Sequence, residues 1–334
     1  MDIVLSVIIV NYNSKNVLQN CLSSLEKYLK EKFNFEVIVI DNASSESINE
    51  LETSFPRVNF IYSEKNIGFA AANNIGLQMS KGKYILLLNP DTIVNENSFQ
   101  PMINYLDNHN DIGIVGCKIY NTGGEIERST HSFPSLLKEF FHANEFIKDF
   151  LSYESKTAGL LKKIFKTKSL DSYWDHDSIK EVDHVTGACM MVKREAVEKA
   201  GLLDEAFFLY NEEVEWSFRI KNAGYKSVFI PDSNIIHLFG HSTKQKVQKQ
   251  TLNHLLVERY RGMFYFFQKH YGFIRLILLK IIVLQGFGFR LILNYLAAVK
   301  VHKTKENNLL NDRKIIKEII SLVYLKNYDW RRSV

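Results

Sequence analysis

Four predicted strands of this chain each end in polar side chains that could hold a ligand. In an open parallel sheet, ligands bind beyond the carboxyl ends of the strands. The alternative is that Asn and Asp simply end each strand through local turn hydrogen bonds. Four such endings along one predicted edge favour a shared ligand site. The residues concerned are Asn11, Asp41, Asn66, Asn89 and Asp91.

A run of carboxylates, Glu212, Glu213 and Glu215, opens a predicted helix that closes near Gly224. Negative side chains stabilise a helix N-terminus, which is one explanation of the run. A carboxylate within hydrogen-bond reach of a hydroxyl can also accept its proton as a general base. The residues alone leave both explanations open.

The elements that must position these side chains alternate between strand and helix. Continuous apolar runs predict the strands, and segments with helical spacing separate them. Unalternated strands of this kind are typical of a parallel sheet covered on both faces. We therefore expect an α/β fold with a mostly parallel sheet flanked by helices. The predicted strands are residues 3–10, 35–40, 58–63 and 83–88.

Composition excludes several other classes of protein. The 334 residues are 46% hydrophobic and 24% charged, which suits one or two globular domains. Three scattered cysteines, Cys21, Cys117 and Cys189, predict neither a disulfide framework nor a zinc site, and they suit a reducing cytoplasm. The chain has no P-loop, no GxGxxG after the first strand and no GxSxG, and its acidic start is no signal peptide.

The charge is unevenly distributed along the chain. Residues 241–334 hold 18 Lys and Arg against 5 Asp and Glu, whereas residues 1–240 hold 24 against 32. An acidic body with a basic tail predicts that the tail meets an anionic surface. Nucleic acid is not the expected partner, because aliphatic runs separate the basic residues where stacking aromatics would be needed.

The apolar segment 273–300 carries basic residues that share one helical arc of about 160°. An apolar face opposite a basic face is typical of a helix lying in a membrane interface. The alternative is a bundle helix packed on the catalytic domain. The basic residues are Arg275, Lys280, Arg290 and Lys300.

Seven stretches, in order, resemble the motifs of inverting family 2 glycosyltransferases with a GT-A fold. The rhamnosyltransferase-like branch of bacterial surface polysaccharide synthesis is the most similar. The stretches are VIIVNYNS (7–14), VIDNASS (39–45), NIGFAAANNIG (66–76), LLLNPDT (86–92), VTGACMMVKREA (185–196), GLLDEAFFLYNEEVEWSFRIKNAGY (201–225) and IIHLFGHS (235–242).

The resemblance implies a catalytic domain over residues 1–245, within which an irregular stretch at about 132–180 is expected to be an insertion. The basic charge of the tail and the two faces of segment 273–300 predict that residues 246–334 form a helical, membrane-associating region. The resemblance further implies transfer of a sugar from a dTDP- or UDP-sugar, with dTDP-rhamnose favoured, to a lipid-linked glycan at the cytoplasmic membrane face. The alternative is a non-catalytic nucleotide-sugar-binding subunit. Whether the protein forms a homo-oligomer is left open.

The resemblance also assigns donor-binding residues. Asp41 would accept a hydrogen bond from the ring N–H of a pyrimidine base. Asp91 stands at the family's DxD-type motif and, with His237, would hold Mn²⁺ or Mg²⁺. Asn89 replaces the first carboxylate of that motif, so it can bind a ribose hydroxyl but brings no charge. The full donor set is Val10, Asn11, Tyr12, Asp41, Asn66, Gly68, Asn74, Asn89 and Asp91.

Glu213 matches the second member of the family's acidic pair, which implies that it is the general base, with Glu212 beside it. The family commonly has Asp at this position, so Glu213 reaches one methylene further. Thr186 and Gly187 match the strand and turn that line the acceptor cleft.

Overall fold

The computed structural model describes residues 3–30, 32–144, 176–238, 249–300, 317–319 and 321–322. The chain divides into two compact units. The described residues of the first unit are 3–30, 32–133 and 176–238. Those of the second are 134–144, 249–300, 317–319 and 321–322. Most of the expected insertion, residues 145–175, lies outside the described residues.

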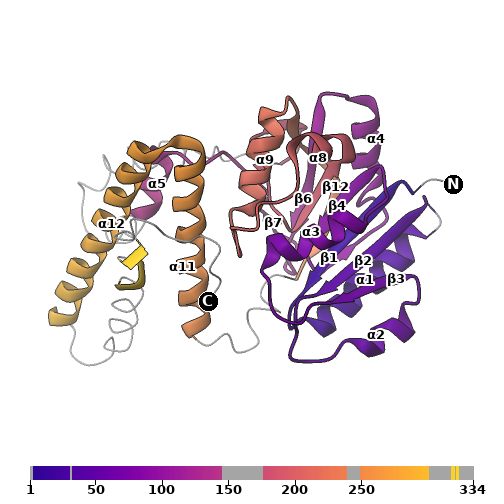
Figure 1. The fold of residues 1–334 in the computed structure, drawn as a ribbon, viewed down its shortest axis with the longest axis horizontal. Helices are drawn as coiled ribbons and strands as arrows, with labels where there is room; N and C mark the ends of the chain where they lie inside the picture. The colour runs from indigo at the N-terminus through magenta and orange to yellow at the C-terminus, as the bar shows by residue number, and fades with distance from the viewer. Residues whose placement is uncertain are drawn as a thin grey trace. The chain divides into compact units, whose positions relative to one another are not determined.

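The first unit is built on a ten-stranded sheet with the strand order β3-β2-β1-β4-β11-β6-β12-β5, in which β7 also pairs with β6 and β9 with β12 (Figure 1). The four strands predicted from continuous apolar runs pair in parallel, and β11 then runs antiparallel between β4 and β6. The mostly parallel α/β sheet is confirmed. The strands of this sheet are β1 (Leu5–Asn11), β2 (Phe35–Asp41), β3 (Val58–Tyr62), β4 (Tyr84–Leu88), β5 (Thr92–Val94), β6 (Ile112–Tyr120), β7 (Ile126–Glu127), β9 (Lys180–Val182), β11 (Cys189–Lys193) and β12 (Lys226–His237).

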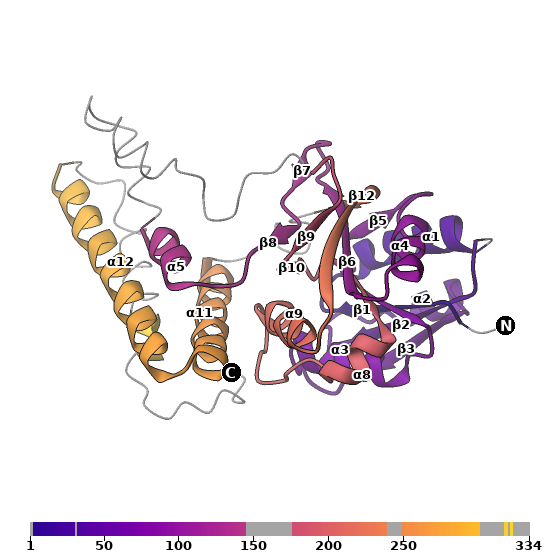
Figure 2. The same cartoon turned by 90° about the horizontal axis from the view of Figure 1, so that it is seen from above.

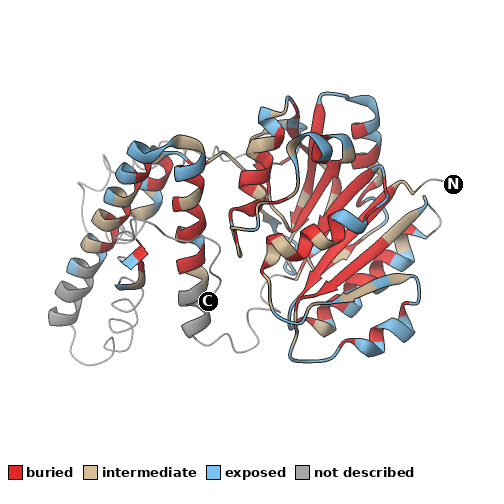
Figure 3. Ribbon diagram, in the orientation of Figure 1, coloured by how far each residue is buried: buried red, intermediate tan, exposed pale blue. Residues whose placement is uncertain are grey.

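Helices cover both faces of this sheet, as Figure 2 shows. One face packs on α1 (Lys15–Leu29), α2 (Asn49–Ser54) and α4 (Gln100–Asn108). The other packs on α3 (Phe69–Met79), α8 (Arg194–Ala200) and α9 (Glu212–Asn222). The side chains of the central strands, β1, β4 and β11 and most of β2 and β6, are consequently buried in two apolar cores (Figure 3). Functional side chains are therefore expected at the strand ends and in the loops beyond them.

The register of the strands brings the expected polar residues level with one another. Asn11 pairs with Asp41 across β1 and β2. His237, the last residue of β12, pairs with Thr92 of β5, which places it beside Asp91. A separate two-stranded ladder joins β8 (Thr130–His131) to β10 (His184–Val185). It leads directly into Thr186.

The second unit is helical in its described part. It contains α5 (Leu136–Ala143), α11 (Lys249–Phe266), a π-helical turn η1 (Phe267–Tyr271) and α12 (Phe273–Lys300). Helix α5 packs on α12, because the Asn144 and Gln285 amides exchange hydrogen bonds of 2.9 and 3.2 Å. A Cβ at Gly286 would lie only 2.5 Å from the Ala143 carbonyl oxygen. The described start of the expected insertion therefore groups with the C-terminal helices.

Where burial is described, at residues 273–290 and 292, helix α12 is buried along one stripe. Leu276, Leu279, Val283 and Phe287 are buried at helical spacing. Lys280 borders this stripe, and burial lowers the pKa of its ammonium group. No helix in the described part of the chain is both long and apolar enough to cross a bilayer. The exposed apolar residues of α12 are Phe273, Ile274, Ile277, Leu278, Ile281, Phe289 and Ile292.

Candidate active site

The site begins at the ends of β1 and β2, where Asn11 and Asp41 form a buried polar pair. The Asn11 amide Nδ2 donates to Asp41 Oδ1 at 2.7 Å and to Ser44 Oγ at 3.1 Å. Ser44 in turn donates to Asp41 through its backbone N–H and its hydroxyl. Asn11 Oδ1 is buried, and no described residue donates to it. A ligand N–H or O–H would satisfy this acceptor.

A second polar cluster joins the end of β2 to the start of α3. The Asn42 side chain donates to Asn66 Oδ1 at 3.0 Å and accepts from the Ile67 N–H at 2.9 Å. Gly68 has φ +86°, and a Cβ there would lie 2.7 Å from the Phe208 side chain. Only glycine fits this position, because any other residue would be both strained and crowded.

The turn after β4 is held from two sides. The Asn89 N–H donates to the Ala188 carbonyl at 3.0 Å, which joins this turn to the loop before β11. The Thr92 hydroxyl donates to the Asn89 carbonyl at 2.8 Å. Below the turn, Cys21 Sγ of α1 lies 3.5 Å from Thr92 Oγ1, and burial raises the pKa of this thiol to about 12. No described residue forms a hydrogen bond to the side-chain amide of Asn89, which is half-buried.

Asp91, His237 and Glu127 form a line of three polar side chains. His237 Nε2 lies 3.2 Å from Asp91 Oδ1, and His237 Nδ1 lies 3.0 Å from Glu127 Oε2. Burial lowers the pKa of His237, but hydrogen bonds and charge from Asp91 and Glu127 outweigh it and raise the pKa overall. Each imidazole nitrogen therefore faces a carboxylate.

Asp91 and His237 are at an ion-pair distance that would also fit two ligand atoms of one divalent ion. Two ligand atoms about 2.1 Å from an ion, at right angles, lie about 3.0 Å apart, close to the observed 3.2 Å between Asp91 Oδ1 and His237 Nε2. The described residues contain no cluster of three or more His, Cys, Asp or Glu side chains arranged to hold a metal. The two protein ligands fit a Mg²⁺ or Mn²⁺ ion that takes its other ligands from substrate phosphates and water.

The acidic pair stands at the start of α9, after a strained backbone. Tyr210 and Asn211 have φ of +70° and +69°, a conformation that side-chain-bearing residues seldom adopt. The Oε2 atoms of Glu212 and Glu213 are buried, and no described residue donates to them. Burial, and then the charge of Glu213, raises the pKa of Glu212 well above its ordinary value; burial also raises the pKa of Glu213.

Gly187 connects the acidic pair to the donor edge. A Cβ at Gly187 would lie 3.9 Å from both Glu213 Cβ and a ring carbon of Phe69, at the start of α3. The next residue, Ala188, accepts the Asn89 N–H. Glu213 therefore lies near Gly187, which directly precedes the residue that accepts a hydrogen bond from the turn carrying Asp91. The half-buried Thr186 precedes Gly187, and its N–H donates to the Ser129 carbonyl at 3.0 Å.

Three of the expected donor residues stand somewhat apart. The Val10 side chain is part of an apolar core. Tyr12 is 48% exposed, at the rim beyond Asn11. The Asn74 amide exchanges hydrogen bonds with the Leu203 backbone and donates to Glu205 Oε1 at 3.0 Å. Asn74 therefore fixes the loop that leads to the acidic pair.

Sequence reasoning missed Glu127 and assigned no role to Asn42 or Ser44. Asn42 and Ser44 lie inside the stretch VIDNASS, so their neighbourhood to Asp41 was visible. Glu127 stands 110 residues from His237, on the two-residue strand β7, and no motif marks it. Only the pairing of β7 with β6 brings it to the site.

Comparisons with known proteins found a family model and several similar sequences. The model of the glycosyl transferase family 2 matches residues 6–201. A low-salt glycan biosynthesis hexosyltransferase of Haloferax volcanii is 27% identical over 65% of this chain, which spans 61% of that relative. An N-acetylglucosaminyl-diphospho-decaprenol L-rhamnosyltransferase of Mycobacterium tuberculosis is 25% identical over 73% of this chain and 78% of its own length. The rhamnosyltransferase WbbL of Escherichia coli is 23% identical over 75% and 89%.

Solved structures share the fold. A mannosyltransferase of Pyrobaculum calidifontis, solved with GDP-Man and Mn²⁺, has a TM-score of 0.54 at 14% identity and covers 97% of this chain and 88% of its own. GalNAc-T7, solved with UDP, GalNAc and Mn²⁺, has a TM-score of 0.52 at 17% identity over 80% of this chain and 51% of its own. Because the family model matches more than half of its residues, this chain belongs to glycosyltransferase family 2 and is a glycosyltransferase with a GT-A fold.

Proposed function

We propose that this glycosyltransferase moves a sugar from a dTDP- or UDP-sugar, with dTDP-rhamnose favoured, to a lipid-linked glycan, with inversion at the anomeric carbon. The observation that carries the proposal is the position of Glu213 near Gly187, one residue before the Ala188 carbonyl that accepts the Asn89 N–H of the turn with Asp91. It brings an unsatisfied carboxylate close to a candidate diphosphate-binding edge. The names of the mycobacterial and Escherichia coli relatives support rhamnose as the sugar, and the mycobacterial name supports a diphospholipid acceptor.

In this mechanism, Glu213 accepts the proton of the acceptor hydroxyl while its oxygen attacks the anomeric carbon. The bond between that carbon and the nucleoside diphosphate breaks on the opposite face, so the anomeric configuration inverts. Asp91 and His237 would hold a Mn²⁺ or Mg²⁺ ion, whose positive charge would stabilise the leaving diphosphate. Glu127 orients the His237 ring through Nδ1, so that Nε2 faces Asp91.

The donor's base is recognised at the ends of β1 and β2. Asp41 Oδ2 accepts only the Ser44 N–H, and Asn11 Oδ1 accepts no described donor. Both are acceptors, as the ring N–H of uracil or thymine requires. Gly68 lets the start of α3 approach the diphosphate, where the helix N-terminus favours negative charge.

The exposed apolar face of α12 holds the enzyme to an anionic membrane, where its lipid-linked acceptor resides. Residues 273–300 contain no Asp or Glu. Phe273 and Ile274 are 70% and 76% exposed, so a bilayer surface would bury side chains that water now covers. The tail's excess of basic residues adds attraction to anionic lipid.

The proposal is tested by transfer assays with dTDP-rhamnose, UDP-glucose and GDP-mannose, each with Mn²⁺ and a diphosphate-linked lipid acceptor. We expect transfer from a pyrimidine nucleotide sugar and none from GDP-mannose, with the product's anomeric configuration read by NMR. Retained configuration would contradict the mechanism, and transfer from GDP-mannose alone would contradict the role of Asp41. Donor binding without any turnover would favour a non-catalytic binding subunit.

Asp91→Asn provides the matched control for the ion. It preserves shape but removes a ligand charge, so we expect turnover to fall about 10²- to 10³-fold. Thermal unfolding without ligand should stay unchanged. Near-normal turnover at limiting Mn²⁺ would remove Asp91 from the proposed metal site.

A further inference from the structure

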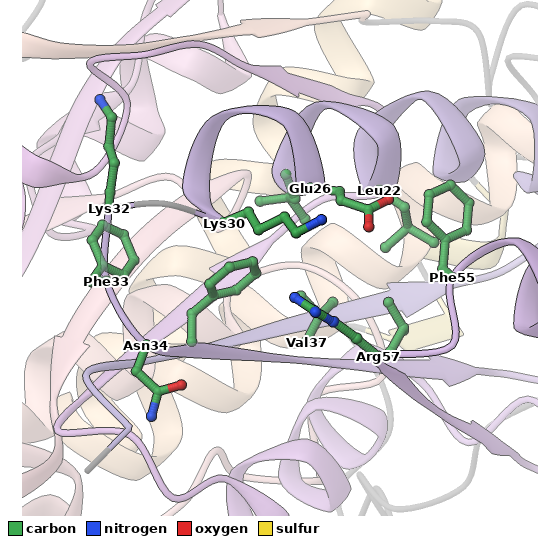
Figure 4. Close-up of a pocket in the computed structure, with 12 residues that line it drawn as sticks. Leu22, Glu26, Lys30, Lys32, Phe33, Asn34, Val37, Phe55 and Arg57 are labelled. Carbon is green, nitrogen blue, oxygen red and sulfur yellow. The ribbon is translucent and has the colours of Figure 1, made fainter. Parts of the chain in front are cut away.

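The first unit contains a pocket far from the candidate active site. It encloses about 490 Å³ between the end of α1 and the starts of β2 and β3 (Figure 4). The donor edge lies at the opposite, carboxyl ends of the same strands. No part of the proposed transfer reaction uses this pocket.

The floor of the pocket is apolar. Leu22 and Leu25 of α1, Val37 of β2 and Phe55 line it, and all four side chains are buried. They belong to the apolar core of that sheet face, so the floor is fixed by packing. A cavity of this size with an apolar floor falls within the range of small-molecule sites.

The rim of the pocket is basic. Among the described residues that line it, Lys30, Lys32 and Arg57 are basic and one, Glu26, is acidic. The Lys32 ammonium donates to the Glu96 carbonyl, so it is already engaged. Within the described residues, neither Lys30 nor Arg57 forms an ion pair. Figure 4 shows the charged ends of both turned into the pocket.

We propose that this pocket binds an amphipathic anion: a medium-length alkyl chain or small ring system that carries one carboxylate or phosphate. The apolar body would cover the floor, and the anionic head would lie between Lys30 and Arg57. Two cations facing one space repel each other, and an anion between them relieves that repulsion. A charge-assisted hydrogen bond from Arg57 would also give the head a defined position.

The probe is octanoate, used below its micelle concentration, with calorimetry on the full-length protein. We expect saturable binding of octanoate. 1-Octanol lacks the charge and acetate lacks the alkyl chain, so each should bind at least about tenfold more weakly than octanoate. Excess UDP should leave octanoate binding unchanged, so this test does not depend on the proposed function. Equal binding of octanoate and 1-octanol, or no saturable binding, would overturn the proposal.

The pocket is tested directly with the double variant Lys30→Gln and Arg57→Gln, which keeps the side-chain stems. It should weaken octanoate binding about tenfold or more and leave 1-octanol binding unchanged. The matched control is Lys81→Gln with Lys199→Gln, which removes the same charge from two exposed residues elsewhere in the first unit. An equal loss in both double variants would show a non-specific charge effect and overturn the site.

Vesicles identify the source of the anion. If the anion is a membrane lipid, the Lys30→Gln and Arg57→Gln variant should bind anionic vesicles more weakly than the control pair. If it is a soluble metabolite, vesicle binding should be equal while octanoate binding still differs. Octanoate binding that is lost on Ile281→Asp in α12, and kept in the pocket variant, would place the site on α12 and refute the pocket.

Discussion

The two units differ in which side chains stand in an unfavourable environment: buried polar atoms in the first and exposed apolar side chains in the second. At the end of β1 and the start of α9 in the first unit, polar atoms of Asn11, Glu212 and Glu213 are buried with no described donor. On α12 of the second unit, large apolar side chains such as Ile274 and Ile281 are exposed. A buried unsatisfied polar atom costs about 1 to 3 kcal/mol, and a contiguous exposed apolar face is unusual in a monomer. The contrast indicates a small polar ligand for the first region and an apolar surface for the second.

The largest expected effect separates the two regions. Glu213→Gln should lower kcat by about 10² to 10⁴, because the acceptor hydroxyl loses its proton acceptor. Donor binding and vesicle binding should both stay near wild type. Steady-state kinetics and vesicle flotation on the same preparation measure this. If Glu212→Gln proved the more damaging change, the base would be the preceding residue.

Glu127→Ala tests whether Glu127 supports the proposed metal ligands Asp91 and His237. Losing the carboxylate on Nδ1 frees the His237 ring, so we expect Mn²⁺ affinity to fall about 10- to 100-fold. Titration of Mn²⁺ by electron paramagnetic resonance, in the presence of UDP, gives the affinity without any turnover. Glu125→Ala, in the exposed turn before β7, is the matched control. Equal affinities in the two variants would remove Glu127 from the site.

Ile281→Asp tests the other side of the comparison. It places a charge in the exposed apolar face, so binding to anionic vesicles should fall about tenfold. Turnover with a soluble acceptor should be unchanged. Gln268→Asp, at an exposed position of η1, adds the same charge outside that face. Unchanged flotation of Ile281→Asp would show that α12 does not contact the bilayer.

The smallest effect concerns stability and pH. Burial raises the pKa of Glu212, so the folded protein keeps a proton that the unfolded chain releases. The wild-type free energy of unfolding should therefore fall as pH rises from the ordinary glutamate pKa through the raised one. Glu212→Gln removes this loss, so it should unfold at higher urea at pH 8, by a free energy on the order of 1 kcal/mol.

The control for this stability effect is another buried glutamate of the same helix. Glu215 is fully buried but accepts from Arg219 Nε at 2.9 Å, so its charge is compensated. Glu215→Gln should destabilise the protein, the opposite sign to Glu212→Gln. Destabilisation by both substitutions would show that the Glu212 charge is compensated in the folded state.

The strand ends were predictable because continuous apolar runs fix both the strand and the residue that follows it. Asn11 and Asp41 needed only that pattern and the rule for parallel sheets. The position of Glu127 depends on how β7 pairs with β6, which no local pattern encodes. The strained residues Tyr210 and Asn211 were equally hidden, because neither is a residue type that marks a positive φ as glycine does.

The tail shows a different limit. Periodicity predicted an apolar face opposite a basic face on this helix, but not that Leu276, Leu279 and Val283, which lie within the basic arc, would be buried. The partners of that stripe include α5, which lies more than a hundred residues earlier in the chain, and α11, where the Tyr260 ring packs edge to face on Phe287. The basic residue Lys280 borders the packed stripe and partly loses its contact with solvent. The exposed apolar residues lie on the opposite side of the helix.

The Cys21 thiol lies beneath the turn that carries Asp91, so its reactivity can report how often that turn opens. A thiol whose pKa is about 12 contains almost no thiolate at neutral pH, so alkylating reagents cannot react with it while the turn is closed. Cys117 and Cys189 are buried in the central strands β6 and β11, where labelling requires wider unfolding. The rate of Cys21 alkylation relative to these two would therefore measure how often the turn opens locally. A donor bound across that turn would slow only the first of the three rates.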